Sequence, residues 1–540
     1  MVLLVAICGA IALVSSLALV PVVRSFARSV GMVDRPDAQR KLQSNAVALG
    51  GGIAVYSSLL IAFVAALLID RAYFGQMLGV ISVRWYVLFG CGAAVLALGL
   101  IDDLWGLRGR QKLLLQCLIV AALVGSGTVI QRLSLFGLTV PLGPLAFPIT
   151  VLWLIVAVNA LNLIDGADGM ATTAGAIICI GLGVASFAMG SPLGGIVGIS
   201  LAAAQIGFLA YNRPPATIYL GDAGSMMIGL FVGVLAIWGN LKESAVLSSA
   251  PVAILAIPLF DSSAAILRRW LTGRSIYVTD RAHLHHLLQE KYGRGKMLWV
   301  VAGLCGITAT LSVMSITFGI HWLPAVGVAV AGAVLILTRS FGHTEARLVL
   351  GSTWQFIQSF VLPPHRCDEE IHQRRVPLQG SGPWDTIWEP LLNFAKAHGL
   401  VRLKISLSLP WLHEGYHAHW QSIRLPEKAR QMNIRLPLFT HRTKDDTQIQ
   451  IGTLEIVAAA DHPEVYQRFA DLGDQLAELT PQIDAVVRKL ESERQQLHSP
   501  MGSPSSAIPN CETITSGDLP SNGSRNSSEE YADASLPSTT

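Results

Sequence analysis

The sequence predicts an all-α polytopic membrane protein of about eleven transmembrane helices, followed by a soluble α/β domain and a disordered tail. Two observations predict this class. Of the 540 residues, 52% are hydrophobic and only 14% are charged, and the mean hydropathy is +0.50, a balance typical of membrane proteins rather than of large soluble ones. Long apolar runs with short polar breaks fill residues 1–340, whereas residues 341–540 have the composition of a soluble chain.

Eleven apolar runs approach the length of about 20 residues that a helix needs to cross a bilayer. They cover 1–23, 49–69, 85–101, 113–131, 143–164, 171–189, 194–212, 224–240, 244–267, 297–318 and 321–338. Two divisions are inferred from breaks at Gly190-Ser191-Pro192 and near Pro324. The first run lacks a preceding basic segment, so it is expected to be a span rather than a cleaved signal.

The loops that follow odd-numbered spans lie on one side of the membrane. They contain sixteen Lys and Arg residues, against four in the opposite loops. The positive-inside rule therefore places the first set of loops in the cytoplasm, together with the residues after 339.

Five polar clusters stand at span ends on this cytoplasmic face. They are Arg40-Lys41, Asp102-Asp103 with Lys112 downstream, Asn159 to Asp168, Asp222, and Asp280 to His286. A charge at the end of a span is costly and tends to mark a functional site. Carboxylates, amides, basic residues and histidines together favour a site for phosphates held through a metal, because Mg²⁺ takes few carboxylates and several phosphate oxygens. We expect the clusters to form one site.

Each cluster also has a structural interpretation. Asp102-Asp103 can be helix-end charges paired locally, and Asp222 can be a helix N-cap rather than a metal ligand. Asn159, Asn162 and Asp165 share one helix face at i, i+3, i+6 and can serve as caps. A zinc site at the histidines is disfavoured by their spacing and the lack of a cysteine partner. The histidine cluster comprises Arg281, His283, His285 and His286. Two interpretations of this cluster stay open, which are contact with phosphates and a solvated polar loop.

The chain resembles the polyprenyl-phosphate N-acetylhexosamine-1-phosphate transferases, a group within glycosyltransferase family 4. The matching segments, in family order, are DRPDAQRK (34–41), DDLWGLRGRQK (102–112), NALNLIDGADGM (159–170), YLGDAGS (219–225) and DRAHLHH (280–286). The HLHH form and the eleven-span layout are similar to the GlcNAc-1-phosphate branch. The resemblance covers about residues 1–340. The chain departs from the family in the first loop, where Gln43, Ala46, Ala48 and Leu49 replace a usual His, prolines and Arg.

The resemblance implies transfer of a sugar 1-phosphate, GlcNAc-1-phosphate by its branch, from a UDP-sugar to a membrane polyprenyl phosphate, with release of UMP. It implies Mg²⁺ as the cofactor, with Mn²⁺ as the alternative, and the bacterial inner membrane as the location. The catalytic carboxylates would be Asp102, Asp103 and Asp222, with Asp222 holding the metal and Asp102 facing the acceptor phosphate. The substrate-binding residues would be Lys41, Lys112, Asn159, Asn162, Asp165, Asp168, Arg281, His283, His285 and His286.

Two other functions are weighed against this one. A catalytically degenerate family member would serve only as a membrane anchor, and the altered first loop leaves that alternative open. A transporter would carry its polar residues at mid-membrane within broken helices, whereas here they cluster at one face. No pattern indicates a nucleic-acid partner.

The remaining chain divides into a cytoplasmic α/β domain of unknown role over 353–495 and a disordered tail over 496–540, rich in Ser, Pro, Asn and Gly. Alternating apolar residues predict a strand over 401–409 and further strand structure around 449–456. Apolar residues spaced 4-3-4-3 over 463–495 suit either a helix packed on the domain or the seam of a homodimer. Pro481 favours packing on the domain. Four tryptophans are expected in the core: Trp384, Trp388, Trp411 and Trp420.

Overall fold

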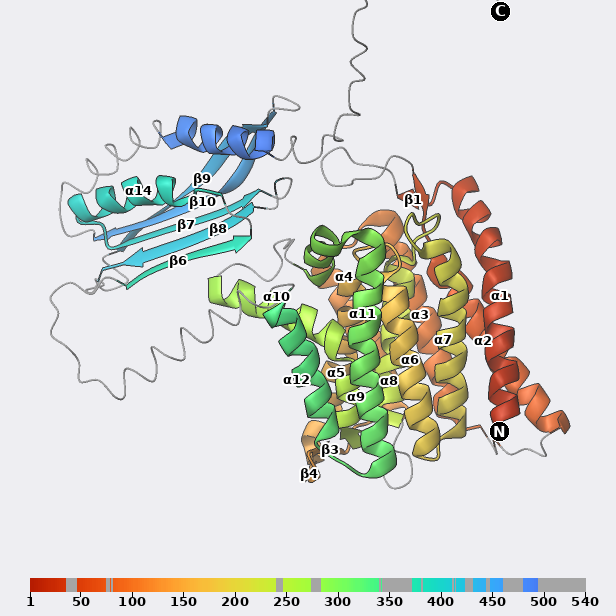
Figure 1. The fold of residues 1–540 in the computed structure, drawn as a ribbon. Helices are drawn as coiled ribbons and strands as arrows, with labels where there is room; N and C mark the ends of the chain where they lie inside the picture. The colour runs from red at the N-terminus through yellow and green to blue at the C-terminus, as the bar shows by residue number, and fades with distance from the viewer. Residues whose placement is uncertain are drawn as a thin grey trace, which may run out of the picture.

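Helices packed side by side form the N-terminal part of the chain (Figure 1). The computed structural model describes residues 1–34, 46–73, 78, 81–238, 246–272, 283–338, 341, 372–379, 382–409, 412, 414–422, 431–442, 447–459 and 479–493. The helices are α1 (Val2–Ser29), α2 (Gly51–Tyr73), α3 (Val83–Trp105), α4 (Gly109–Gly125), α5 (Ala146–Ile164), α6 (Met170–Ala188), α7 (Pro192–Asn212), α8 (Gly221–Trp238), α9 (Ser249–Ile254), α10 (Ala256–Thr272), α11 (Leu284–Phe318) and α12 (Leu323–Leu337).

All eleven predicted spans overlap helices, but not all of these helices have the length of a span. Among the described residues, eight helices are long and apolar enough to cross a membrane by length and composition. The four remaining described helices of this part are α4, α9, α10, whose apolar part is Ala256–Leu267, and α12. The predicted span 244–267 is divided because α9 ends at Ile254 and α10 begins at Ala256. The chain is thus an integral membrane protein, and the count of eleven stays a prediction.

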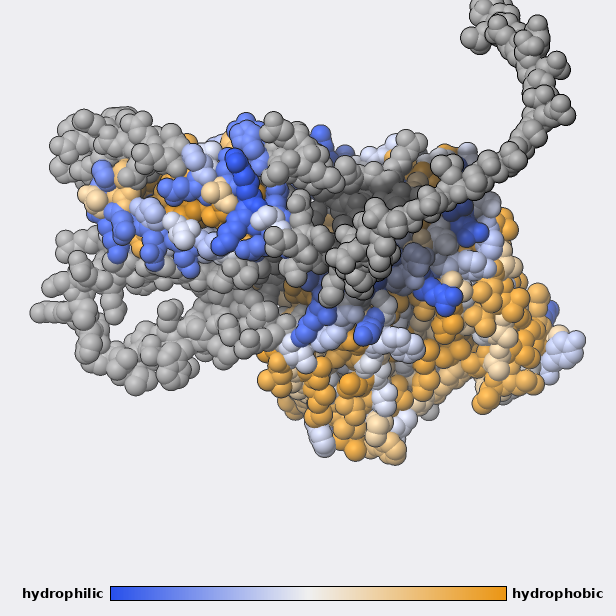
Figure 2. Space-filling view, turned by 45° about the horizontal axis from the view of Figure 1, so that its top comes forward, coloured by the Kyte–Doolittle hydropathy of each residue, from blue (hydrophilic) through white to orange (hydrophobic). Residues whose placement is uncertain are grey.

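The outer surface of the helices is apolar over a broad region, with hydrophilic residues gathered toward one end (Figure 2). Large apolar side chains such as Leu114, Leu152 and Trp299 are exposed on it. An apolar surface of this extent suits contact with lipid rather than water.

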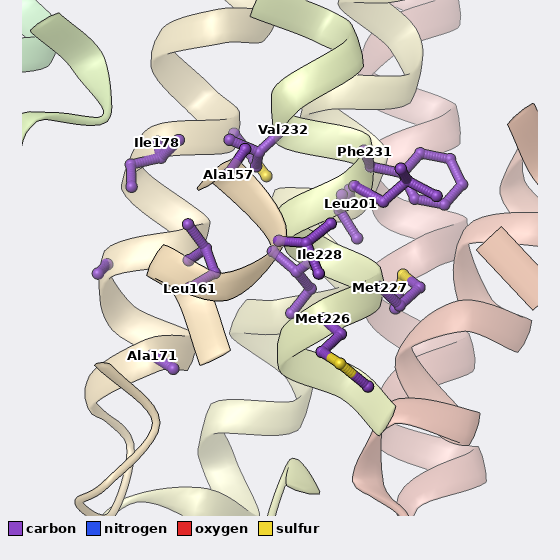
Figure 3. Close-up of a cluster of buried hydrophobic side chains, with 14 of the residues drawn as sticks. Ala157, Leu161, Ala171, Ile178, Leu201, Met226, Met227, Ile228, Phe231 and Val232 are labelled. Carbon is purple, nitrogen blue, oxygen red and sulfur yellow. The ribbon is translucent and has the colours of Figure 1, made fainter. Parts of the chain in front are cut away.

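Helix α8 is the centre of the bundle, and every residue from Ala223 to Trp238 is buried. Its side chains pack against α5, α6 and α7 (Figure 3). Small residues let neighbouring helices approach its first turn closely: a Cβ added at Gly52 would lie 2.5 Å from Cα of Gly224, and one added at Gly99 would overlap the backbone of Ala223. The first turn of α8 is therefore held against α2 and α3.

Short strands lie at the two ends of the bundle. At one end, β1 (Val33–Asp34) pairs with β2 (Val47–Ala48), and Ala48 forms a bridge to Ile218 just before α8. At the other end, β3 (Arg132–Leu135) pairs with β4 (Leu138–Pro141) and β5 (Val246–Ser248) (Figure 1). The end of the first loop is thus fastened to the segment that leads into α8.

A five-stranded antiparallel sheet forms the C-terminal part, in the order β6-β8-β7-β10-β9. The strands are β6 (His372–Gln379), β7 (Arg402–Leu409), β8 (Glu414–Gln421), β9 (Gln431–Arg442) and β10 (Thr447–Ala459), and helix α14 spans Asp385–Ala397. The predicted strand over 401–409 is confirmed, since buried and partly exposed residues alternate along β7.

The core of this sheet domain contains three of the four tryptophans, as predicted: Trp384, Trp388 and Trp420 are buried, and Trp411 lies outside the described residues. Residues 479–493 are helical, and Leu479, Ile483 and Val487 are buried in the same core. Within the described part, this helix packs on its own domain, as Pro481 indicated, and the homodimer stays a prediction. Residues 463–478 and the tail 496–540 lie outside the described residues.

Candidate active site

The first turn of α8 carries Asp222 and is capped by a carboxylate from another helix. Asp103, near the end of α3, accepts hydrogen bonds from the backbone N–H groups of Asp222 at 3.1 Å and Ala223 at 3.4 Å. The first N–H groups of a helix have no partner within it, so a carboxylate there satisfies them. Asp103 thus positions Asp222 through the backbone, whereas the adjacent Asp102 contacts the side chain of Lys112.

Lys112, from α4, lies between two carboxylates. Its Nζ is 2.8 Å from Oδ2 of Asp102 and forms a second ion pair with Asp222. Asp102 also accepts the backbone N–H of Leu107 at 2.7 Å, in the turn between α3 and α4. The side chains of Lys112 and Asp102 are 15% and 11% exposed and that of Asp222 is 36% exposed, so the pair opens toward solvent on the Asp222 side.

The two asparagines of α5 have different environments. Asn162 donates to Oδ1 of Asp222 at 2.8 Å and to Oγ of Ser225 at 3.0 Å, so it belongs to the site. Asn159 donates to Oε1 of Gln116 at 2.9 Å and to the carbonyl of Ile155 at 2.8 Å. Asn159 thus joins α5 to α4 through a polar contact with the buried Gln116.

Asp165 and Asp168 follow α5 in the next turn. Asp168 accepts the backbone N–H of Ala216 at 3.1 Å, which ties this turn to the loop after α7. Desolvation raises the pKa of Asp165 well above the ordinary range of an aspartate, and the negative charges of Asp222, Asp103 and Asp168 add to this shift. Burial therefore favours the protonated form of Asp165, and the neighbouring carboxylates add to this preference.

The histidine cluster lies at the start of α11. His283 is the N-cap residue, and its ring is parallel to that of His285, with centroids 5.8 Å apart. The His286 ring lies 4.1 Å from that of His285. A Cβ added at Gly166 would overlap the His285 ring, so the glycine makes room for the histidine beside Asp165.

Replacing Gly166 by Ala tests this contact. We expect the displaced His285 ring to lower kcat by about tenfold or more, because a small misplacement of site groups is costly in rate. The measurement is the steady-state rate of the reaction proposed below. The matched control is Gly90→Ala on α3, where an added Cβ meets nothing within 4 Å. A Gly166→Ala protein as active as the control would contradict a role for the His285 position.

Of the predicted site residues, the structure brings together Asp102, Asp103, Lys112, Asn162 and Asp222 by direct contacts. Asp165, Asp168 and the three histidines lie in the adjoining turn and helix. Lys41 and Arg281 lie outside the described residues. The sequence interpretation missed Gln116, Ser225 and Asp261. All three are polar residues inside runs that were predicted to span the membrane, which is a signal of function or of buried contact.

The carboxylates around Asp222 are the side chains that could hold the expected Mg²⁺. Asp102 and Asp222 share the ammonium group of Lys112, and Asp103 and Asp165 lie close enough to Asp222 to interact with it electrostatically. Several neighbouring carboxylates of this kind suit a divalent cation. No three His, Cys, Asp or Glu side chains of the described residues are placed to hold a metal by themselves. Mg²⁺ is commonly held by one or two carboxylates and by substrate phosphates, so the residues fit a cation that arrives with its substrate.

Fold and site define a multispanning helical membrane protein with an acidic, lysine-bridged site at one end of its bundle. The sequence model of glycosyl transferase family 4 matches residues 85–240, which include this site from α3 to α8. A probable undecaprenyl-phosphate N-acetylglucosaminyl 1-phosphate transferase of Bacillus subtilis is 32% identical over 318 residues, 58% of this chain and 85% of that protein. The decaprenyl-phosphate N-acetylglucosaminephosphotransferase of Mycobacterium tuberculosis is 31% identical over 274 residues, 46% and 68% of the two chains.

An undecaprenyl-phosphate alpha-N-acetylglucosaminyl 1-phosphate transferase of Thermotoga maritima is 29% identical over 286 residues, 52% of this chain and 81% of that protein. The chain belongs to the polyprenyl-phosphate N-acetylglucosamine 1-phosphate transferases of glycosyl transferase family 4.

Proposed function

We propose that the protein transfers N-acetylglucosamine 1-phosphate from UDP-N-acetylglucosamine to a polyprenyl phosphate in the membrane and releases UMP. The observation that carries the proposal is the arrangement of Asp102, Lys112 and Asp222 at the end of the bundle, in a chain of this family. The apolar outer surface in Figure 2 supports a lipid acceptor. The position of the site at a bundle end supports a water-soluble donor.

In the proposed reaction, an oxygen of the lipid phosphate attacks the β-phosphorus of the donor. A new phosphoanhydride bond to the lipid forms, and the bond between the α- and β-phosphates breaks, so that UMP leaves with its bonding electrons. A phosphate monoester is largely dianionic at neutral pH, since its second pKa is about 6. A strong base is therefore unnecessary, and positioning and charge neutralisation supply most of the rate enhancement.

The side chains divide this work. Asp102, held by Lys112 and by the N–H of Leu107, orients the acceptor phosphate and takes any remaining proton. Lys112 offsets the charge of the carboxylates and of the incoming phosphates. Asp222, aligned by Asn162 and by the Asp103 cap, would hold Mg²⁺, with Mn²⁺ as the alternative; the cation would neutralise charge on the diphosphate and on the departing UMP.

Location follows from the charge distribution of the sequence. We place the site and the C-terminal domain on the cytoplasmic side of the bacterial inner membrane, because the loops that carry the site hold most of the Lys and Arg residues. This orientation suits a donor that is made in the cytoplasm.

The test uses the purified full-length protein in lipid nanodiscs, with UDP-N-acetylglucosamine and polyprenyl phosphate. We expect release of UMP that requires both the lipid and Mg²⁺, stops on chelation with EDTA, and returns with Mg²⁺ or Mn²⁺. Absence of UMP above the lipid-free control, with Mg²⁺ present, would refute the proposed function.

A further inference from the structure

A buried aspartate that has no part in the reaction described above lies behind the histidine cluster. Asp261, on α10, is fully buried, with 0% of its surface exposed. Its Oδ1 accepts the backbone N–H of Leu284, the first residue of α11, at 2.7 Å. A buried carboxylate is costly unless it is paired or hydrogen-bonded, so a second partner is expected.

That second partner is the imidazole of His283. Its Nδ1 lies 3.2 Å from Oδ2 and 3.3 Å from Oδ1 of Asp261. Because an ionised carboxylate can only accept hydrogen bonds, Nδ1 of His283 is the donor. The same carboxylate therefore holds both the ring of the N-cap residue and the first backbone N–H of α11.

This contact fixes which edge of the ring is free. With Nδ1 turned toward Asp261, Nε2 lies on the opposite edge of the imidazole. The ring is stacked on His285, which lies against Gly166 in the turn that carries Asp165. A continuous set of contacts thus runs from Asp261 through two histidines to the acidic site.

We propose that Asp261 is a positioning residue, which orients His283 so that Nε2 meets a phosphate oxygen of the nucleotide-sugar donor. This inference rests on the proposed function. A phosphate oxygen that contacts Nε2 then lies on the edge of the ring opposite the Asp261 carboxylate. Without Asp261, the His283 ring can rotate, and its proton can move from Nδ1 to Nε2.

The first experiment measures kcat and KM for UDP-N-acetylglucosamine in nanodiscs. We expect Asp261→Asn to lower kcat by about 10- to 100-fold, the usual cost of losing a carboxylate that orients a functional histidine. The matched control is Asp70→Asn near the far end of α2: Asp70 is also buried and accepts the N–H of Leu78 at 3.0 Å. The control is expected to keep the wild-type kcat.

Double substitution separates positioning from a structural role. If Asp261 acts through His283, then Asp261→Asn combined with His283→Ala has the same kcat as His283→Ala alone. Losses that multiply would overturn the proposal, and so would an Asp261→Asn protein with wild-type kcat.

A second pair of variants leaves Asp261 in place and tests whether Nε2 of His283 is the atom that contacts the phosphate. This test holds even where Asp261→Asn does not fold. The amide nitrogen of Gln reaches about as far as Nε2, whereas that of Asn reaches about as far as Nδ1. We expect His283→Gln to be about tenfold more active than His283→Asn; equal activities or the reverse order would contradict the assignment of Nε2. A wild-type protein without UMP release would instead refute the proposed function.

Discussion

Replacing Asp222 by Asn is expected to lower kcat by about 10³-fold, equivalent to about 4 kcal/mol of transition-state stabilisation. Asn keeps the size of the side chain but removes its charge. The Asp222 carboxylate pairs with Lys112 and accepts a hydrogen bond from Asn162. In the proposed reaction it would hold the cation that stabilises the departing UMP. The rate of UMP release in nanodiscs measures the effect.

A control and a metal exchange make this prediction sharper. Asp385→Asn, in the C-terminal domain, removes a carboxylate that accepts from Tyr416 at 2.8 Å and should leave the rate unchanged. Asp222→Cys should be inactive with Mg²⁺ and regain activity with Mn²⁺ or Cd²⁺, because a thiolate favours softer cations. If Asp222→Asn retains more than about a tenth of the wild-type rate, Asp222 does not hold an essential metal.

Replacing Lys112 by Met is expected to lower kcat by about 10² to 10³-fold. The change leaves the Asp102 and Asp222 carboxylates without their shared cation, so these carboxylates repel the incoming phosphates. It also destabilises the metal-free protein by about 2 kcal/mol, because charged groups in a partly buried site lose a hydrogen-bonded partner. Mg²⁺ should restore part of that stability, since the two carboxylates then attract the cation more strongly.

The matched variant is Lys112→Arg, which keeps the charge but changes the geometry of donation. It should be intermediate in rate, because guanidinium and ammonium groups are not interchangeable in a close contact. Thermal unfolding with and without Mg²⁺ follows the stability change. A Lys112→Met protein that keeps the wild-type kcat, or that Mg²⁺ does not stabilise more than it stabilises the wild type, would contradict this role.

Much of the site was predictable because membrane helices rarely end in charged residues without a reason. Asp102 and Asp222 were identified as carboxylates at span ends, Asn162 by its spacing on one helix face, and Lys112 by the resemblance; the four lie in direct contact. The different environments of Asp102 and Asp103 follow from helix geometry, since adjacent residues point in directions about 100° apart. What was not predictable is which neighbour each one would meet: the backbone that Asp103 caps lies more than a hundred residues away in sequence.

The role of Asp261 was overlooked for a related reason. It lies inside a run predicted as one span, 244–267, which the structure divides between α9 and α10. Its partner His283 lies about twenty residues further along the chain, so no local spacing joined them. The break between α9 and α10 was not predicted because hydropathy detects apolar runs but not the breaks within them.

In the proposed reaction a sugar 1-phosphate, rather than the sugar alone, moves to the lipid. UDP-N-acetylglucosamine carrying ³²P in its β-phosphate tests this directly, when the lipid and nucleotide products are separated after reaction with polyprenyl phosphate and Mg²⁺. We expect the label to enter the lipid fraction while unlabelled UMP is released. Label that stays in released UDP, with a sugar attached to the lipid, would contradict it.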